Sequence, residues 1–176
     1  MSRVQWYALI IVAAILGGGW IYLTRVPDDA AIAASVAAHV NFRAPEFTLT
    51  TLDGASVASS DLRGKAVLVN FWATWCPPCR SEMPDIESAY QAHRDQFVVL
   101  AINDAEDGGT VKQFVDQFHF TFPILLDRDV AVAKRFQVQS LPTSFFIDRN
   151  GVIRAANVGQ MDRAYIETQI AALTTH

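Results

Sequence analysis

The sequence predicts an α/β fold in which a mixed sheet carries helices on both faces, preceded by one transmembrane helix. Three observations support this prediction. From residue 44 onward, apolar runs alternate with stretches of helical periodicity, first as strand–helix–strand and then as strand–strand–helix. An Asn-Gly turn between the last two apolar runs is typical of an antiparallel hairpin. Residues 4–23 form an apolar run that contains no charged residue.

The N-terminal run is long enough to cross a bilayer, because about 20 apolar residues in a helix span roughly 30 Å. Aromatic residues lie near both of its ends, as in interfacial anchoring: Trp6, Tyr7, Trp20 and Tyr22. A cleaved signal peptide is the alternative, although its apolar core would normally be about 7–15 residues long. We therefore predict a transmembrane anchor over residues 1–25, a linker over 26–43 and a globular domain over 44–176.

The globular domain is predicted to open with two short strands and a buried strand. Residues 44–57 indicate two strands around the turn pair Asp53-Gly54. A turn over residues 60–65 then leads into the apolar run 66–72, which predicts a buried strand.

Helices and strands alternate through the rest of the chain. A helix is predicted to run to about residue 93, followed by a buried strand at 97–102. Because the crossover is this long, the two strands that flank it should pair in parallel. The remaining predicted elements are a helix at 110–118, a strand at 123–126, a short helix at 130–136, strands at 144–147 and 152–156, and a helix at 161–173.

The two cysteines of the chain, Cys76 and Cys79, lie where the buried strand gives way to the first helix. A helix N-terminus presents unpaired N–H groups and the positive end of the dipole, which favour a thiolate. The thiolate is the attacking species in disulfide exchange. We therefore predict that Cys76 is the nucleophile and that Cys79, one turn later and more buried, resolves the intermediate. Pro77 and Pro78 suit a first helical turn, because no N–H partner is lost there.

Other uses of the cysteine pair are less favoured by the sequence. A zinc site would need two more ligands, and the four histidines are scattered without ligand-like spacing, so no metal is expected. A purely structural disulfide would close too short a loop to remove much unfolded-state entropy. A peroxidatic cysteine of the peroxiredoxin kind would need a threonine three residues earlier, where Ala73 stands, with Thr74 one place away.

Residues 70–84, Asn-Phe-Trp-Ala-Thr-Trp-Cys-Pro-Pro-Cys-Arg-Ser-Glu-Met-Pro, resemble the active-site segment of the thioredoxin superfamily. Within it they are most similar to the membrane-tethered TlpA/ResA-like branch of bacterial thiol–disulfide oxidoreductases. The resemblance runs from about residue 44 to residue 173. It implies a thioredoxin-like fold with an extra N-terminal β-hairpin over the predicted strands at 44–57.

A second segment, Leu141-Pro142-Thr143, matches the place where the superfamily carries a cis-proline that faces the dithiol. The resemblance implies that Pro142 packs against the sulfurs and keeps metals off them. It also implies that Leu141 and Thr143 lie where an extended segment of a target protein pairs. The alternative is a trans proline that begins an edge strand.

The predicted acid–base group differs from that of small thioredoxins, which place a buried aspartate where Asn70 stands. Glu82 follows Cys79 by three residues and so lies on the same side of the helix. It also matches a glutamate of the TlpA/ResA-like branch, and we predict that it is the proton relay for Cys79. The alternative is a solvent-exposed helix carboxylate. Trp75 and Trp72 are predicted to wall the site, with core packing as the alternative for Trp72.

The predicted function is thiol–disulfide exchange outside the cytoplasm, because a dithiol is most useful in an oxidising compartment. We expect a single-pass protein of the bacterial inner membrane with its catalytic domain in the periplasm, and no cofactor besides the redox-active disulfide. Dispersed basic residues and a net charge of −4 argue against a nucleic-acid partner.

The resemblance further implies a reductase that takes electrons from a membrane thiol transporter. Its expected clients are protein disulfides or dithiols, such as those of apocytochrome c or of copper-site assembly proteins. One alternative is a copper-binding redox chaperone, because soft thiolates bind copper(I). Another is a dithiol oxidase, because the direction of exchange depends on the reduction potential.

Overall fold

The computed structural model describes residues 5–7, 11–16, 31 and 39–174. Contacts divide the chain into two units, Met1–Ala31 and Ile32–His176. In the first unit, residues 5–7 and 11–16 are helical and their side chains are exposed. The predicted span covers residues 4–23, and its remaining residues, 4, 8–10 and 17–23, lie outside the described residues. Among the described residues, no helix has both the length and the apolar character needed to cross a bilayer.

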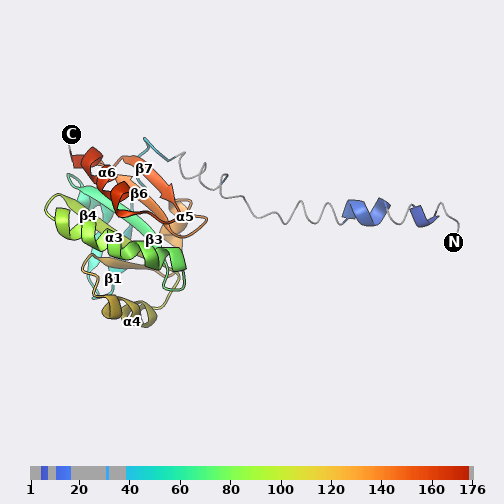
Figure 1. Ribbon diagram of the computed structural model, residues 1–176, viewed down its shortest axis with the longest axis horizontal. Coiled ribbons are helices and arrows are strands. Elements are labelled where there is room, and N and C mark those ends of the chain that lie inside the picture. Colours follow the sequence, from blue (N-terminus) through green and yellow to red (C-terminus); the bar gives the residue numbers. More distant parts are fainter. Residues whose placement is uncertain (1–4, 8–10, 17–30, 32–38, 175–176) are drawn as a thin grey trace. The chain divides into compact units, whose positions relative to one another are not determined.

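The second unit is built on one mixed, seven-stranded sheet (Figure 1). Its strands are β1 (Thr48–Thr51), β2 (Ser56–Ala58), β3 (Ala66–Trp72), β4 (Phe97–Asp104), β5 (Ile124–Asp127), β6 (Thr143–Ile147) and β7 (Ile153–Val158). Their spatial order is β2-β1-β5-β4-β3-β6-β7. The strands β3, β4 and β5 pair in parallel, and all other neighbours are antiparallel. The predicted parallel β3–β4 pair and the antiparallel C-terminal hairpin are both confirmed.

The predicted N-terminal hairpin is present and extends the central sheet. The strands β1 and β2 pair around a turn in which Gly54 has φ +87°, a conformation that favours glycine. The strand β1 also pairs with β5, through Thr50 opposite Leu126 and Thr51 opposite Leu125. The hairpin therefore covers the edge of the sheet that β5 would otherwise expose.

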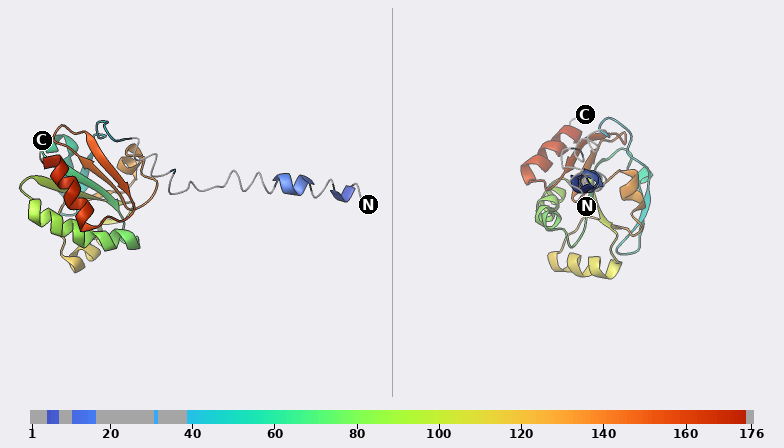
Figure 2. Two further views of the ribbon diagram at one scale, coloured as in Figure 1. Left: turned by 45° about the horizontal axis from the view of Figure 1, so that its top comes forward. Right: turned by 90° about the vertical axis from the view of Figure 1, so that its right-hand side faces the viewer.

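Helices cover both faces of the sheet, as predicted (Figure 2). They are α3 (Pro77–His93), α4 (Gly108–Phe118), α5 (Ala131–Arg135) and α6 (Arg163–Thr174), with a short 3-10 helix, η1 (Ser59–Leu62), before β3. On one face, Ile86 of α3 and Ile166 of α6 belong to the same core cluster as Leu68. On the other face, Phe136 beside α5 packs against Phe71 and its neighbours.

Strand β3 lies at the centre of both cores, and all its residues are buried. Side chains alternate between the two faces of a strand. Accordingly Leu68 and Trp72 join the core under α3, whereas Val69 and Phe71 join the core under α5. By the same alternation Asn70 falls on the α3 face, where it is fully buried. A polar side chain is thereby placed directly beneath α3.

Residues 41–43, at the end of the predicted linker, pair with the start of β7. The backbone N–H of Asn41 donates to the carbonyl of Ile153 at 2.8 Å, and the N–H of Ile153 donates to the carbonyl of Phe42 at 3.0 Å. Residues 26–30 and 32–38 of the predicted linker lie outside the described residues.

Candidate active site

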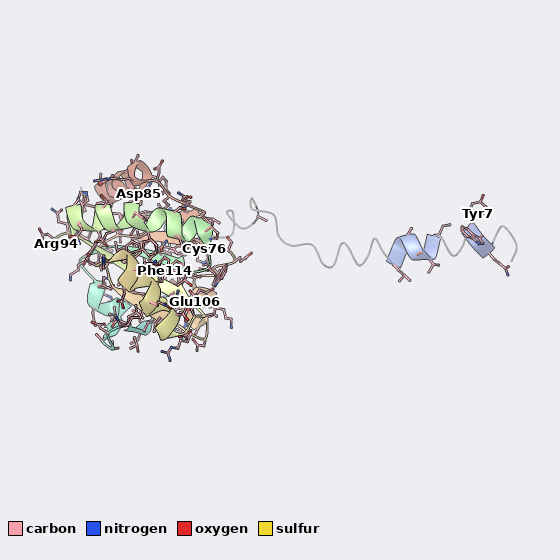
Figure 3. All side chains as sticks on the ribbon, turned by 60° about the horizontal axis from the view of Figure 1, so that its bottom comes forward. Tyr7, Cys76, Asp85, Arg94, Glu106 and Phe114 are labelled. Atoms are coloured by element: carbon pink, nitrogen blue, oxygen red, sulfur yellow. A yellow bond between two sulfur atoms is a disulfide. The ribbon has the colours of Figure 1, made fainter. Side chains whose placement is uncertain are left out.

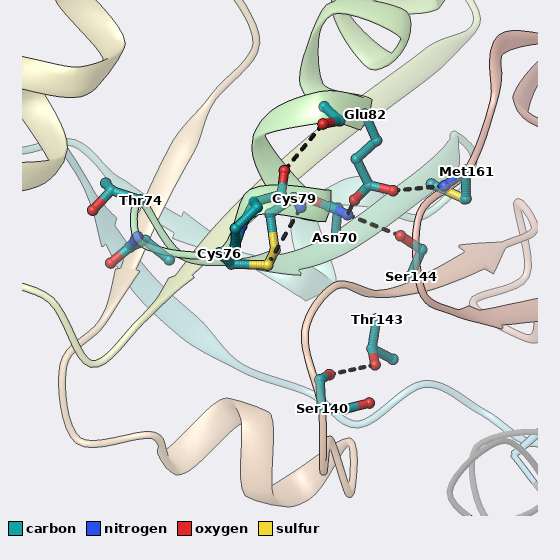
Figure 4. Close-up of a disulfide and its surroundings, with 12 residues drawn as sticks. Asn70, Thr74, Cys76, Cys79, Glu82, Ser140, Thr143, Ser144 and Met161 are labelled. Carbon is teal, nitrogen blue, oxygen red and sulfur yellow. Dashed lines mark hydrogen bonds between the residues drawn. A yellow bond between two sulfur atoms is a disulfide. The ribbon is translucent and has the colours of Figure 1, made fainter. Parts of the chain in front are cut away.

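The two cysteines form a disulfide at the junction between β3 and α3 (Figure 4). Cys76 is the N-cap residue of α3, and its Sγ accepts a hydrogen bond from the backbone N–H of Cys79 at 3.3 Å. Pro77 and Pro78 occupy the first helical positions, where a missing N–H leaves no partner unsatisfied. The strand–turn–helix that the sequence predicted therefore positions both sulfurs at the helix N-terminus.

Burial differs little between the two cysteines in this oxidised state. Cys76 is 3% exposed and Cys79 is fully buried, which is the predicted order. The two tryptophans of the segment lie in different environments. Trp75 is 67% exposed beside Cys76, whereas Trp72 is fully buried and its ring lies 5.5 Å from that of Phe114. Trp72 therefore contributes core packing.

Glu82 is fully buried and lies in a polar cluster beneath α3. Its carboxylate accepts hydrogen bonds from Asn70 Nδ2 at 2.7 Å and from the backbone N–H of Met161 at 2.9 Å. Asn70 Nδ2 also donates to Ser144 Oγ at 2.9 Å. Figure 4 shows these four residues next to the disulfide. The alternative of a solvent-exposed helix carboxylate is therefore wrong.

The environment of Glu82 changes its acidity. Burial raises the pKa of Glu82 from its ordinary 4.5 to about 7, although the hydrogen bonds from Met161 and Asn70 partly oppose this shift. A carboxyl group that titrates near neutral pH can both accept and donate a proton under ordinary conditions. The sequence placed Glu82 on the correct side of the helix but could not show its burial.

The segment Leu141-Pro142-Thr143 lies at the same end of the sheet as the cysteines, because Thr143 pairs with Phe71 near the end of β3. The Leu141–Pro142 peptide bond is cis, as predicted. Thr143 is fully buried, and its hydroxyl donates to the carbonyl of Ser140 at 2.7 Å. Leu141 is only half-buried. Of the two predicted client-contacting residues, Leu141 is thus the accessible one.

One carboxylate bonded to the turn that precedes the dithiol was not predicted. Glu106, in the loop between β4 and α4, accepts hydrogen bonds from the backbone N–H of Thr74 at 2.7 Å and from the Thr74 hydroxyl. It also accepts one from Asn103 Nδ2 at 2.7 Å. Its position after the carboxyl end of β4 was a usable signal, because loops at the carboxyl ends of neighbouring parallel strands meet.

No group of three or more His, Cys, Asp or Glu side chains within the described residues could hold a metal ion.

Known proteins with similar sequences carry names that refer to thiol–disulfide or thioredoxin-like proteins. Residues 40–156 match the AhpC/TSA family. The thiol–disulfide oxidoreductase ResA of Geobacillus kaustophilus is 39% identical over 166 residues, which cover 94% of this chain and 91% of the relative. The thioredoxin-like protein YneN of Bacillus subtilis is 36% identical over 171 residues, which cover 94% of this chain and 96% of the relative.

Solved structures agree with the sequence comparisons. A putative thiol:disulfide interchange protein DsbE from Chlorobium tepidum is 36% identical and superposes with a TM-score of 0.67, covering 75% of this chain and 95% of that one. StoA from Bacillus subtilis is 28% identical with a TM-score of 0.64, covering 72% and 96%. With its thioredoxin-like α/β fold, the chain belongs to the AhpC/TSA family and is a thiol–disulfide oxidoreductase of the ResA and DsbE type.

Proposed function

We propose that this chain reduces disulfides of extracytoplasmic client proteins, with Cys76 as the nucleophile and Cys79 as the resolving thiol. The observation that carries the proposal is the placement of the pair at the N-terminus of the 17-residue helix α3. The N–H of Cys79, which donates to Cys76 Sγ, and the helix dipole there stabilise a thiolate at Cys76. Cys79 is fully buried, so a client disulfide reaches Cys76 first.

The exchange has two steps. In the first, the Cys76 thiolate attacks one sulfur of the client disulfide, the client S–S bond breaks, and the other client sulfur leaves as a thiolate that takes up a proton. In the second, the Cys79 thiolate attacks Cys76 Sγ, the mixed disulfide bond breaks, and the remaining client sulfur leaves as a thiolate that takes up a proton. The products are a reduced client and the Cys76–Cys79 disulfide, so two electrons pass to the client.

Glu82 is proposed as the base for the second step. It follows Cys79 by three residues and so lies on the same side of α3. Because its pKa is raised to about 7, it can take the proton of the Cys79 thiol as that sulfur attacks. The same carboxyl returns a proton to Cys79 when the disulfide is reduced again.

Electrons are carried by the disulfide itself in this proposal, and no other cofactor is required. A membrane thiol transporter is proposed to reduce the disulfide between cycles. The apolar run at residues 4–23 supports attachment to the bacterial inner membrane, with the domain in the periplasm. Apocytochrome c and copper-site assembly proteins are the proposed clients, on the basis of the resemblance to the TlpA/ResA-like branch.

The reduction potential of the Cys76–Cys79 pair tests the direction of exchange. The full chain is equilibrated with reduced and oxidised glutathione, and the fraction of free thiol is measured by alkylation. We expect a value near thioredoxin's, about −270 mV, because the proposed role is that of a reductant. A value near DsbA's, about −120 mV, would identify an oxidase instead.

Copper bound in stoichiometric amount after purification under reducing conditions would favour the copper-binding alternative.

A further inference from the structure

The turn that carries the nucleophile is tied to a neighbouring loop by one carboxylate. Residues 73–76 connect β3 to α3, and the backbone N–H of Cys76 donates to the carbonyl of Ala73 at 3.2 Å. Within this turn, Thr74 donates both its backbone N–H and its hydroxyl to Glu106. Trp75 is 67% exposed and so gives the turn little anchorage in the core. Ala73 and Cys76 bury the two ends of the turn, and Glu106 is the side chain that accepts hydrogen bonds from its middle.

Glu106 is itself well fixed. The residue before it, Ala105, adopts a left-handed conformation with φ 62°, and its N–H donates to the carbonyl of Asp127 at 3.2 Å. Asn103 Nδ2 donates to the Glu106 carboxylate at 2.7 Å. Asp107, the next residue, is the N-cap of α4. The carboxylate thus extends from a loop that is bonded to β5 and continuous with β4 and α4.

The parallel register explains why these two loops meet. Asn103 of β4 is the register partner of Trp72 of β3, so both strands end side by side. Thr74 then follows Trp72 by two residues, and Glu106 follows Asn103 by three. Figure 3 shows Cys76 and Glu106 toward the same end of the domain.

We infer that Glu106 is a positioning residue for Cys76, which fixes the turn so that the sulfur stays at the N-terminus of α3. The inference rests on the proposed role of Cys76 as nucleophile. Without the hydrogen bonds to Thr74, the turn samples conformations in which Cys76 Sγ leaves the N–H of Cys79 and the helix dipole. A thiolate that spends less time there is less stabilised and forms at a higher pH.

Two substitutions separate this positioning role from a simple effect of the negative charge. Both Glu106→Gln and Glu106→Ala remove the charge. In Glu106→Gln, the amide oxygen can still accept from Thr74 N–H and Asn103 Nδ2, and the amide nitrogen can donate to the Thr74 hydroxyl. In Glu106→Ala all three bonds are lost. A difference between the two variants therefore reports the hydrogen bonds and not the charge.

The measurement is the rate of alkylation of the reduced full chain by iodoacetamide as a function of pH, with the modified cysteine identified by mass spectrometry. We expect Glu106→Ala to react at least fivefold more slowly at pH 7 than Glu106→Gln. We also expect its half-maximal reactivity to lie at a higher pH. Equal rates and equal midpoints in the two variants would overturn the inference.

The chain contains a matched control toward the C-terminal end of the same helix. Glu87 accepts hydrogen bonds from the backbone N–H of Thr121 at 2.9 Å, from the Thr121 hydroxyl at 2.7 Å and from Gln91 Nε2 at 2.9 Å. This is the same set of donor types, but Glu87 lies 11 residues after Cys76, about 16 Å along the helix. Glu87→Ala should lose comparable stability and leave the alkylation profile unchanged.

Two results would separate the failure of this inference from the failure of the proposed mechanism. If Glu87→Ala shifts the alkylation profile as much as Glu106→Ala, the effect is general loosening and the inference is wrong. If iodoacetamide modifies Cys79 rather than Cys76 in the unaltered chain, the assignment of the nucleophile is wrong, and the positioning role of Glu106 falls with it.

Discussion

Replacement of Cys76 by serine is expected to abolish reduction of a client disulfide, and replacement of Cys79 by serine is expected to stop the reaction at the mixed disulfide. Cys76 holds the attacking sulfur in the proposed mechanism, and a serine hydroxyl is not ionised at neutral pH. We expect a loss of roughly 10³-fold or more, as for other enzymes that lose their nucleophile. In Cys79→Ser the first attack remains possible, but no second thiol releases the client.

The two substitutions are compared by insulin reduction and by non-reducing electrophoresis with a disulfide-bonded client. Cys79→Ser should accumulate a disulfide-linked complex with the client that dithiothreitol reduces, and Cys76→Ser should form no such complex. The variant with both cysteines replaced is the control for nonspecific association. A complex that forms through Cys79 in Cys76→Ser, with none in Cys79→Ser, would show that the roles are reversed.

The stability of the oxidised chain is expected to fall as the pH rises from about 4.5 to about 7, and Glu82→Gln should remove much of this dependence. The pKa of Glu82 is raised to about 7 in the fold, from an ordinary 4.5. The folded state therefore binds more protons than the unfolded state between these values, and the free energy of unfolding decreases with pH. The contribution is fully present below about pH 4.5 and is lost above about pH 7.

The expected size follows from the pKa difference. The difference between a pKa of 4.5 and one of about 7 corresponds to about 3 kcal/mol. Glutamine resembles the protonated acid, so Glu82→Gln should match the unaltered chain near pH 4.5 and exceed its stability at pH 8 by up to this amount. Urea denaturation of the oxidised full chain at several pH values measures the difference.

Other carboxyl groups contribute to the same pH range or to a lower one. Burial raises the pKa of Asp104, and hydrogen bonds lower the pKa of Asp148 although burial opposes them. Both contributions are present in the unaltered chain and in Glu82→Gln, so they cancel in the difference. Glu87→Gln removes a carboxyl group from the surface of the same helix and serves as the control. Parallel stability curves for the unaltered chain and Glu82→Gln would contradict the raised pKa.

The same substitution tests the proposed proton relay. Release of the client from the mixed disulfide should accelerate as the pH rises through about 7 in the unaltered chain, because Glu82 becomes a base over this range. In Glu82→Gln that acceleration should be absent. An unchanged pH profile for release would remove Glu82 from the mechanism while leaving both cysteines in place.

Local signals in the sequence were enough to predict most of the elements and the dithiol. The apolar run of β3, the helical spacing after Cys79 and the Asn150-Gly151 turn each depend on neighbouring residues alone, and each is confirmed. The start of α4 was predicted two residues late, at 110, because the N-cap bonds of Asp107 to the amides of Gly109 and Thr110 extend the helix.

The surroundings of the dithiol could not be predicted in the same way. Ser144 and Met161 lie 74 and 79 residues from the partners they contact, and nothing in their own sequence neighbourhood marks them. Glu106 lies 32 residues from Thr74. The pairing of β1 with β5 is likewise a long-range contact. Such contacts depend on the order of the strands, which the sequence of apolar runs does not specify.

The N-cap of α3 joins helix stability to the oxidation state of the chain. In the disulfide, Cys76 Sγ is a neutral acceptor for the N–H of Cys79. In the reduced chain a thiolate at the same place accepts a charge-assisted hydrogen bond, which is roughly twice as strong. The first turn of α3 is therefore closed by a covalent bond between Cys76 and Cys79 when the chain is oxidised, and by this hydrogen bond alone when it is reduced. The oxidised and the reduced protein thus differ in what holds the turn beside the exposed Trp75.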